Sequence, residues 1–146
     1  TIVVGGVDRF NSVSEGLKII TKTSIVAIHD GVRPLISEKL IHRLMKKVKP
    51  GHAVIPVVSV KESIRKISDG KTKNIERKHL YIVQTPQCFM VNDIKKAYEK
   101  NYDLCFTDDA SVFEKNMGEI ICIDGEEKNI KITTKDDLKV AKSFMQ

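Results

Sequence analysis

The stretch IVAIHDGVRPLISEKLIHRLMKKVKPGHAVIPV, residues 25–57, carries a pattern from which the fold class can be predicted. Residues 25–28 are apolar and predict a buried strand, and Ser37 then caps a helix whose apolar residues recur every three or four positions. Pro50-Gly51 ends that helix, and residues 53–57 predict a second buried strand. Short apolar strands that alternate with helices favour an α/β fold, with a mostly parallel sheet and helices on both faces.

The rest of the chain continues this alternation. Further strands are expected at 2–4, 80–83, 120–123 and 129–133. Further helices are expected to begin at Ser12 (with Glu15 in a capping box), at Asn92, at Thr107 or Asp108, and at Thr134 (with Asp137 three residues later). The last helix is expected to turn an apolar face inward, made of Leu138, Ala141, Phe144 and Met145.

Residues 59–79 interrupt the alternation. They form two polar segments around Asp69-Gly70, and Asp-Gly between alternating residues strongly favours a tight hairpin turn. Because these segments are too polar to form a core element by themselves, we expect a projecting β-arm.

Length and composition favour a single globular domain. The 146 residues fall within the usual size of one domain. No apolar run approaches the roughly 20 residues needed to span a bilayer, and no signal peptide is visible, so we expect a soluble protein without a membrane partner. Three cysteines without CxxC spacing favour a reducing compartment, here the cytoplasm, and predict no metal site built from cysteine.

The net charge of +6 suits an anionic partner. A basic protein can bind nucleic acid, an anionic membrane surface or phosphorylated small molecules. The lysines are scattered over predicted helix faces, and aromatic residues are few. We therefore expect most of the lysines to form an ordinary solvated surface, and we expect no nucleic-acid partner.

Three predicted strand ends carry residues that suit a ligand. In open α/β sheets, ligands bind beyond the carboxyl ends of the strands. The three are Gly5-Gly6 with Arg9 and Ser12, His29-Asp30-Gly31 with Arg33, and Gln84-Thr85-Pro86-Gln87.

Each candidate also has a plainer explanation. Gly5-Gly6 lets a backbone approach a ligand closely, but it also suits an ordinary turn. Asp30 could hold a divalent cation or a ribose hydroxyl, or it could simply cap a turn. Arg33 is either its ion-pair partner or a phosphate ligand. His29 favours a packing role, and Lys131 a solvated edge strand.

Six segments taken together resemble the 2-C-methyl-D-erythritol 4-phosphate cytidylyltransferase family. In family order they are GGVDRFNSVSEGL, HDGVRP, ESIRK, QTPQCF, TDDAS and NIKITTKDDL, which begin at residues 5, 29, 62, 84, 107 and 129. The resemblance implies a Rossmann-like nucleotidyltransferase fold. It also implies transfer of a cytidylyl group from CTP to 2-C-methyl-D-erythritol 4-phosphate, with Mg²⁺ or another divalent cation, in non-mevalonate isoprenoid synthesis. The family is a homodimer joined through a β-arm.

The same resemblance implies roles for individual residues. Those of the CTP site would be Gly5, Gly6, Arg9 and Ser12 at the cytosine, with Asp30 and Gly31 near the ribose and the metal-bound phosphates. Those of the second substrate, a polyol phosphate, would be Arg33, Thr85, Thr107 and Lys131, with Ser63 and Arg77 from the neighbouring subunit. Asp30 would bind the metal, and Asp30, Arg33 and Lys131 would act in catalysis.

The sequence departs from the family pattern in several places. HDGVRP stands for HDAARP, TDDAS for TDEAS, and Ser63 for a usual threonine. No segment matches the family's glycine-rich loop, which wraps the triphosphate. We therefore expect residues 1–146 to be the C-terminal two thirds of the enzyme, a partial domain that lacks its first strand and that loop, and to be inactive alone. The alternatives are a ribitol-5-phosphate cytidylyltransferase and a non-catalytic nucleotide-binding or dimerisation module.

Overall fold

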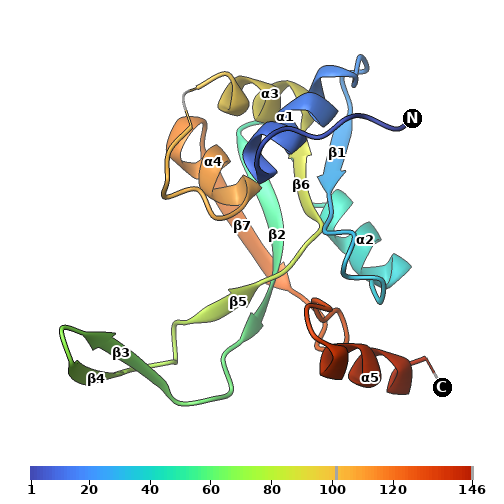
Figure 1. The fold of residues 1–146 in the computed structure, drawn as a ribbon. Helices are drawn as coiled ribbons and strands as arrows, with labels where there is room; N and C mark the ends of the chain where they lie inside the picture. The colour runs from blue at the N-terminus through green and yellow to red at the C-terminus, as the bar shows by residue number, and fades with distance from the viewer. Residues whose placement is uncertain (101, 146) are drawn as a thin grey trace.

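A five-stranded mixed sheet forms the body of the protein in the computed structural model, which describes residues 1–100 and 102–145 (Figure 1). Its strands are β1 (Ile25–Ile28), β2 (His52–Ser59), β5 (Tyr81–Val83), β6 (Gln87–Met90) and β7 (Glu119–Asp124). The central strand β2 is parallel to β7 on one side and antiparallel to β6 and β5 on the other. Strand β1 is antiparallel to β6 and forms the far end of the sheet.

Three strands nevertheless share one direction. Because β6 is antiparallel to both β1 and β2, and β7 is parallel to β2, the carboxyl ends of β1, β2 and β7 lie at one edge of the sheet. The expectation of a mostly parallel sheet is wrong. The chain leaves β2 through the arm and returns antiparallel along β5 and β6, whereas the sequence predicts no strand at 87–90.

Helices cover both faces of the sheet, as expected. On one face, α1 (Arg9–Lys18), α3 (Val91–Tyr98) and α4 (Asp109–Asn116) pack over Ala53 and Phe89. On the other face, α2 (Glu38–Met45) packs Leu40 and Leu44 over Val54 and Cys88. The two cores alternate along β2 and β6 because successive residues of a strand point to opposite faces.

The predicted arm is confirmed as a two-stranded antiparallel hairpin, β3 (Ile64–Ser68) and β4 (Lys71–Ile75). It extends away from the body at the lower left of Figure 1. Asp69 and Gly70 have φ angles of 52° and 73° at the turn. Positive φ at both central residues is what a two-residue type I′ hairpin turn requires.

The N-terminal predictions need correction. Residues 2–4, which lie within the described part of the chain, form no strand, and Val4 is 88% exposed. Helix α1 begins at Arg9 rather than Ser12, because the Asp8 carboxylate accepts the Asn11 backbone N–H at 2.7 Å and so provides the cap. Ser12 lies inside the first turn, where its hydroxyl donates to the Asp8 carbonyl oxygen at 2.7 Å.

Two further boundaries differ from the predictions. Residues 129–133 are described as a loop rather than a strand. The side chain of Asn129 donates to the Thr85 carbonyl, and the Ile132 N–H donates to the Val32 carbonyl, so these groups do not join a sheet ladder. Helix α3 begins at Val91 after Met90, and Asn92 does not cap it.

The caps of the last two helices are as predicted. Asp108 caps α4 in a capping box with Ser111, and Thr134 caps α5 (Lys135–Ser143) in a capping box with Asp137. The expected inner face of α5 is not buried, however. Ala141 is buried, whereas Phe144 is 51% exposed. This helix follows the loop after β7 and lies below the body in Figure 1.

Candidate functional site

A pocket of about 230 Å³ lies at the sheet edge where β1, β2 and β7 end. Six residues predicted for the site line it, namely Arg9, Asp30, Arg33, Thr85, Thr107 and Lys131. We refer to it as the Asp30 pocket. The topology explains this meeting, since Asp30 follows β1, Thr85 precedes the antiparallel strand β6, and Lys131 follows β7.

Asp30 lies between two cations. Its Oδ2 atom is 3.3 Å from the Nε of Arg33 and 3.3 Å from the Nζ of Lys131. Burial alone would raise the pKa of this carboxyl, but the charges and hydrogen bonds of Lys131 and Arg33 outweigh it, so the pKa of Asp30 lies below its usual value. The Asp30 carboxylate thus holds two positive groups side by side at the pocket, which suits phosphate chemistry.

Arg33 is buried and held from two sides. Its Nη1 donates to the Asn129 carbonyl at 2.8 Å, and its Nε donates to Asp30. The sequence left an ion pair and a phosphate ligand open for this residue. The structure shows the ion pair, and it also places the guanidinium in the lining of the Asp30 pocket.

A second charged cluster forms the wall on the α1 side. Arg9 donates to both carboxylate oxygens of Asp109, at 3.0 and 2.6 Å, and the Tyr98 hydroxyl donates to the same carboxylate at 2.6 Å. Asp109 is 0% exposed. Its hydrogen bond raises the pKa of Arg9, and burial, together with this carboxylate, raises the pKa of Tyr98. The cluster ties α1 to α3 and α4.

Buried polar residues to which the sequence assigned no individual role connect these walls. Gln87 donates to the Asp108 carboxylate at 2.7 Å and accepts the Ala110 N–H at 2.8 Å. Asn129 links Arg33 to the Thr85 carbonyl. One signal for Asp109 was available, because a helix needs a single capping carboxylate and TDDAS supplies two.

Several other residues predicted for the site lie outside the described lining of the Asp30 pocket. Gly6 donates its N–H to the Ser12 hydroxyl at 3.0 Å, at the start of α1. A Cβ on Gly6 would lie 2.3 Å from the Cβ of Asn11, so glycine is required there. Gly31 faces open space, where a side chain would meet nothing within 4 Å.

Ser63 and Arg77 lie on the β-arm rather than in the Asp30 pocket. Ser63 is exposed and directly precedes β3, and Arg77, also exposed, donates to the Lys61 carbonyl across the base of the arm. Within one chain, these two residues therefore do not line the pocket with Asp30.

Of the two carboxylates that line the Asp30 pocket, Asp108 already accepts hydrogen bonds from Ser111 and Gln87, which leaves Asp30 as the one available to a metal ion. Among residues 1–100 and 102–145, no group of three or more His, Cys, Asp or Glu side chains is arranged to hold a metal. Mg²⁺ commonly binds one or two carboxylates together with substrate phosphates and water. Asp30 therefore fits a metal that is shared with a nucleotide, and does not fit a metal held by the protein alone.

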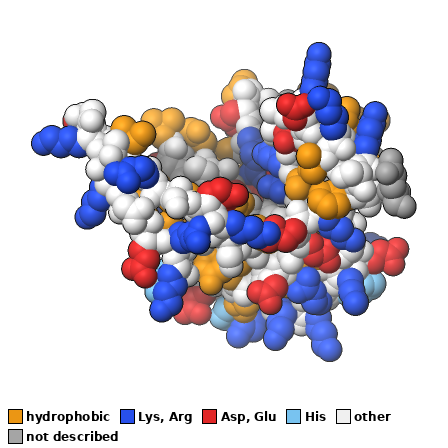
Figure 2. Space-filling model, turned by 90° about the horizontal axis from the view of Figure 1, so that it is seen from below, with side chains coloured by type: hydrophobic (Ala, Val, Ile, Leu, Met, Phe, Trp, Pro, Cys, Tyr) orange, Lys and Arg blue, Asp and Glu red, His pale blue; other side chains and the backbone are white. Residues whose placement is uncertain are grey.

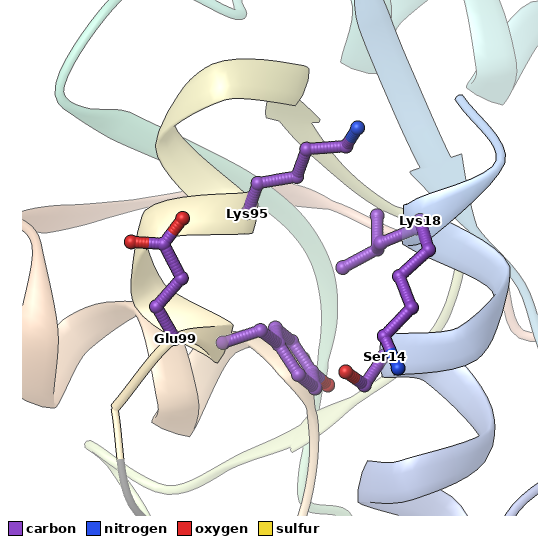
Figure 3. Close-up of a pocket in the computed structure, with 6 residues that line it drawn as sticks. Ser14, Lys18, Lys95 and Glu99 are labelled. Atoms are coloured by element: carbon purple, nitrogen blue, oxygen red, sulfur yellow. The ribbon is translucent and has the colours of Figure 1, made fainter. Parts of the chain in front are cut away.

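A larger groove of about 430 Å³ lies between α1 and α3. Figure 3 shows Ser14 and Lys18 from α1 on one side of it, and Lys95 from α3 and Glu99, which directly follows α3, on the other. Lys95 donates to the Ile20 carbonyl at 2.5 Å and so links α3 to the segment that follows α1. The groove lies away from the sheet edge and holds none of the predicted site residues among its described lining, so we place the candidate site in the Asp30 pocket.

Comparisons with known proteins agree on one family. The family model of 2-C-methyl-D-erythritol 4-phosphate cytidylyltransferase matches residues 1–146. The chain is 41% identical over 144 residues to the protein of that name from Bacteroides fragilis, covering 99% of this chain and 66% of the relative. It is 43% identical over 150 residues to that from Bacillus pumilus, covering 99% of this chain and 65% of the relative.

Solved structures agree with this result. The structure of 4-diphosphocytidyl-2C-methyl-D-erythritol synthase from Anaerococcus prevotii has a TM-score of 0.83 and 33% identity, over 97% of this chain and 66% of that one. The corresponding cytidylyltransferase from Francisella tularensis has a TM-score of 0.77 and 32% identity, over 95% of this chain and 69% of that one. The chain thus spans just under two thirds of the length of these curated relatives.

Proposed function

We propose, because the chain belongs to the 2-C-methyl-D-erythritol 4-phosphate cytidylyltransferase family, that its protein transfers a cytidylyl group from CTP to 2-C-methyl-D-erythritol 4-phosphate. The observation that supports this most directly is the Asp30 pocket, where the Asp30 carboxylate meets the cations Arg33 and Lys131 at the sheet edge. Two substrates that each carry phosphate need such a concentration of positive charge.

The proposed reaction is a single in-line displacement. A phosphate oxygen of the methylerythritol phosphate attacks the α-phosphorus of CTP, the bond from that phosphorus to the bridging oxygen breaks, and pyrophosphate leaves. No covalent enzyme intermediate is needed, so catalysis consists of positioning and charge neutralisation. Arg33 and Lys131 would neutralise phosphate oxygens, and Asp30 would keep the two cations in place.

A divalent cation, with Mg²⁺ the expected one, belongs to the same proposal. Asp30 would hold it together with the phosphates of CTP. When bound, the cation would screen the negative charge of the triphosphate and favour the departure of pyrophosphate.

The remaining roles follow the resemblance. Gly5, Gly6, Arg9 and Ser12 would recognise the cytosine. Of these four residues, Arg9 is the one that lines the Asp30 pocket, and this position supports its proposed role. Gly31 would leave room beside the ribose and phosphates, and the open space around it is consistent with this. Thr85 and Thr107 would border the polyol phosphate.

We further propose that Ser63 and Arg77 serve the active site of a second copy in a homodimer joined by the β-arm. Their exposed positions on the arm, outside the Asp30 pocket of their own chain, support an action in trans. The arm is strongly basic, with Lys66, Lys71 and Lys73 exposed on it, and this charge suits a phosphorylated substrate.

We propose a cytoplasmic location for the protein. The three free cysteines suit the cytoplasm. Among the described residues, none of the helices combines the length and the apolar character that crossing a bilayer would require. We expect residues 1–146 by themselves to give no turnover, since no segment of this sequence matches the glycine-rich triphosphate loop of the family pattern.

An assay of pyrophosphate release tests the function. The protein from its complete gene should release pyrophosphate from CTP and Mg²⁺ when 2-C-methyl-D-erythritol 4-phosphate is added, and far less with ribitol 5-phosphate. The reverse preference would favour ribitol-5-phosphate cytidylyl transfer. An absence of turnover, together with equal binding of CTP and ATP in calorimetry, would favour a non-catalytic module.

Figure 2 shows basic side chains interleaved with acidic ones on the face seen from below, which is unlike a continuous nucleic-acid-binding stripe.

A further inference from the structure

Asp108 is the second carboxylate in the lining of the Asp30 pocket. It lies at the N-terminus of α4, directly after Thr107, and it is half-buried. Asp108, Thr107 and Arg9 also line a neighbouring pocket of about 170 Å³, so these three residues stand where the two pockets meet. The position of Asp108 therefore borders a space that a substrate can enter.

Two neutral donors hold the Asp108 carboxylate. Its Oδ1 accepts the Ser111 N–H at 2.8 Å, and its Oδ2 accepts a hydrogen from Nε2 of Gln87 at 2.7 Å. An ionised carboxyl group has about four lone-pair positions, so these two bonds leave acceptor positions over. A hydroxyl group can use such a position without displacing either bond. The carboxylate thus has a fixed orientation and a remaining capacity to accept hydrogen bonds.

The two carboxylates of the pocket differ in their charged partners. Asp30 contacts Arg33 and Lys131, whereas no Lys, Arg or His side chain in the described part of the chain lies within ion-pair distance of Asp108. The start of α4 favours a negative charge, because the free amides of a helix N-terminus carry partial positive charge. Asp108 therefore keeps its charge for a donor, while Asp30 shares its charge with two cations.

A hydroxyl is the substrate group that fits Asp108. A carboxylate without a cationic partner repels a phosphate, but it accepts a short, charge-assisted hydrogen bond from a hydroxyl. The acceptor substrate of the proposed reaction carries its phosphate at C4 and a hydroxyl at C1, at opposite ends of a four-carbon chain. With the phosphate at Arg33 and Lys131, which follow β1 and β7, the hydroxyl end can extend toward the start of α4.

We propose that Asp108 is a specificity-determining residue, which accepts a hydrogen bond from the C1 hydroxyl of the polyol phosphate. It thereby selects a substrate with phosphate at one end and a hydroxyl at the other, and it sets the direction in which that substrate lies. This inference rests on the proposed cytidylyl transfer. It adds a contact beside those proposed for Thr85 and Thr107, and Gln87 and Ser111 position the carboxylate that makes it.

Kinetics with two matched substrates test the contact in the protein from its complete gene. The substrates are 2-C-methyl-D-erythritol 4-phosphate and its 1-deoxy analogue, in which hydrogen replaces the C1 hydroxyl. The wild type should have a kcat/KM about 10- to 100-fold lower for the analogue, because it lacks a hydrogen bond to a charged group. Asp108→Asn, which keeps a good helix cap, should use the two substrates about equally well, with little change in the KM for CTP.

Matched controls separate the substrate contact from the helix cap. Asp8 caps α1 through the Asn11 N–H, as Asp108 caps α4, but Asp8 is not in the described lining of the Asp30 pocket. Asp8→Asn should therefore keep the full preference for the hydroxylated substrate. Asp108→Ser keeps a capping hydroxyl but is shorter and uncharged, so it should lose the preference as Asp108→Asn does. Thermal unfolding shows which variants fold, and the wild-type comparison of the two substrates needs no variant.

Three results would overturn the proposal. The wild type could use both substrates equally well, or folded Asp108 variants could keep the full preference, and Asp108 would then be a helix cap alone. A rise in the KM for CTP alone would place the carboxylate at the nucleotide. If the wild type formed no product from 2-C-methyl-D-erythritol 4-phosphate, the proposed function would fail and this inference with it. Product formation without discrimination at C1 would remove the inference and leave the proposed function standing.

Discussion

Asp30 has a structural role at the same position for which we propose a functional one. Its carboxylate, 15% exposed, contacts two cations that come from different parts of the chain. Removal of Asp30 would leave Arg33 buried beside Lys131 with one negative partner fewer. The ion pair and the ligand site are therefore not alternatives, because the pair arranges the cations that a phosphate would meet.

Asp30→Asn should destabilise the protein by about 1–3 kcal/mol at neutral pH, since hydrogen bonds to charged groups are lost. The folded pKa of Asp30 lies below its ordinary 3.8, so its contribution is fully present above about pH 4 and declines as the pH falls through the folded pKa. Urea unfolding between pH 3 and 7 measures this. The difference in the free energy of unfolding between the wild type and Asp30→Asn should be constant above pH 4 and should narrow below it. A gap that widens in acid would contradict the argument, and the exposed Asp136→Asn is the control.

Replacement of Arg9 and replacement of Asp109 should destabilise the protein by different amounts. Arg9→Ala leaves a fully buried carboxylate with the Tyr98 hydroxyl as its remaining partner among the described residues, and should cost about 3–5 kcal/mol. Asp109→Asn leaves Arg9, which is 42% exposed and can turn toward water, and should cost about 1–3 kcal/mol. Chemical denaturation of both variants checks the order. Equal losses, or a larger loss for Asp109→Asn, would show that the buried charge is not the dominant cost.

The sequence made some of these residues predictable and concealed others. Asp30 and Arg33 follow an apolar strand, where charges need an explanation, and so they could be found. Asp109, Gln87 and Asn129 are polar residues buried by partners far along the chain. Asp109 is the second carboxylate of TDDAS and Gln87 lies in a candidate strand end, but no local pattern predicts that these side chains are buried. Their partners become known only once α1, α4 and the loop after β7 are placed together.

The N-terminal cap of α5 predicts a response to acid. Asp137 accepts hydrogen bonds from the Thr133 backbone at 2.9 Å and from the Thr134 backbone at 2.8 Å, and these bonds lower its pKa to about 2. The cap should therefore persist at pH 4 and be lost as the pH falls toward 2.

Amide chemical shifts of Thr133 and Thr134 followed from pH 6 to pH 1.5 measure this loss, and their common midpoint should lie near 2. Thr134→Ala should abolish the common midpoint and weaken the helix by about 1 kcal/mol. A midpoint at the ordinary carboxyl value near 4 would show that the cap does not form.

Elements with a local signal were predicted, and elements that depend on distant partners were not. Ser37, Asp108 and Thr134 cap helices as expected, and Asp69-Gly70 forms the hairpin turn. The short strand β6 could not be recognised in QTPQCF, because its strand character comes from pairing with β1 and β2 on both sides. Residues 129–133 have an alternating pattern, but their backbone binds loops instead of a neighbouring strand.

The basic arm is the element that we propose joins the molecule to a second copy. If Ser63 and Arg77 act in trans, then Arg77→Ala and Asp30→Ala inactivate different halves of a shared active site. Mixed dimers of the two variants should regain activity, up to about one quarter of the wild-type rate for random pairing in which one of two sites is intact. Mixing the purified variants and assaying pyrophosphate release measures this. Mixtures as inactive as the separate variants, with heterodimers verified by mass spectrometry, would exclude action in trans.

The central claim is that the Asp30 pocket supports cytidylyl transfer to a methylerythritol phosphate. Phosphorus NMR of one reaction with CTP, Mg²⁺ and equal amounts of 2-C-methyl-D-erythritol 4-phosphate and ribitol 5-phosphate tests it most directly. The protein from its complete gene should form the methylerythritol cytidine diphosphate and pyrophosphate, and Lys131→Ala should reduce that rate by about 100-fold or more. Exclusive formation of the ribitol product, or full activity in Lys131→Ala, would contradict the account.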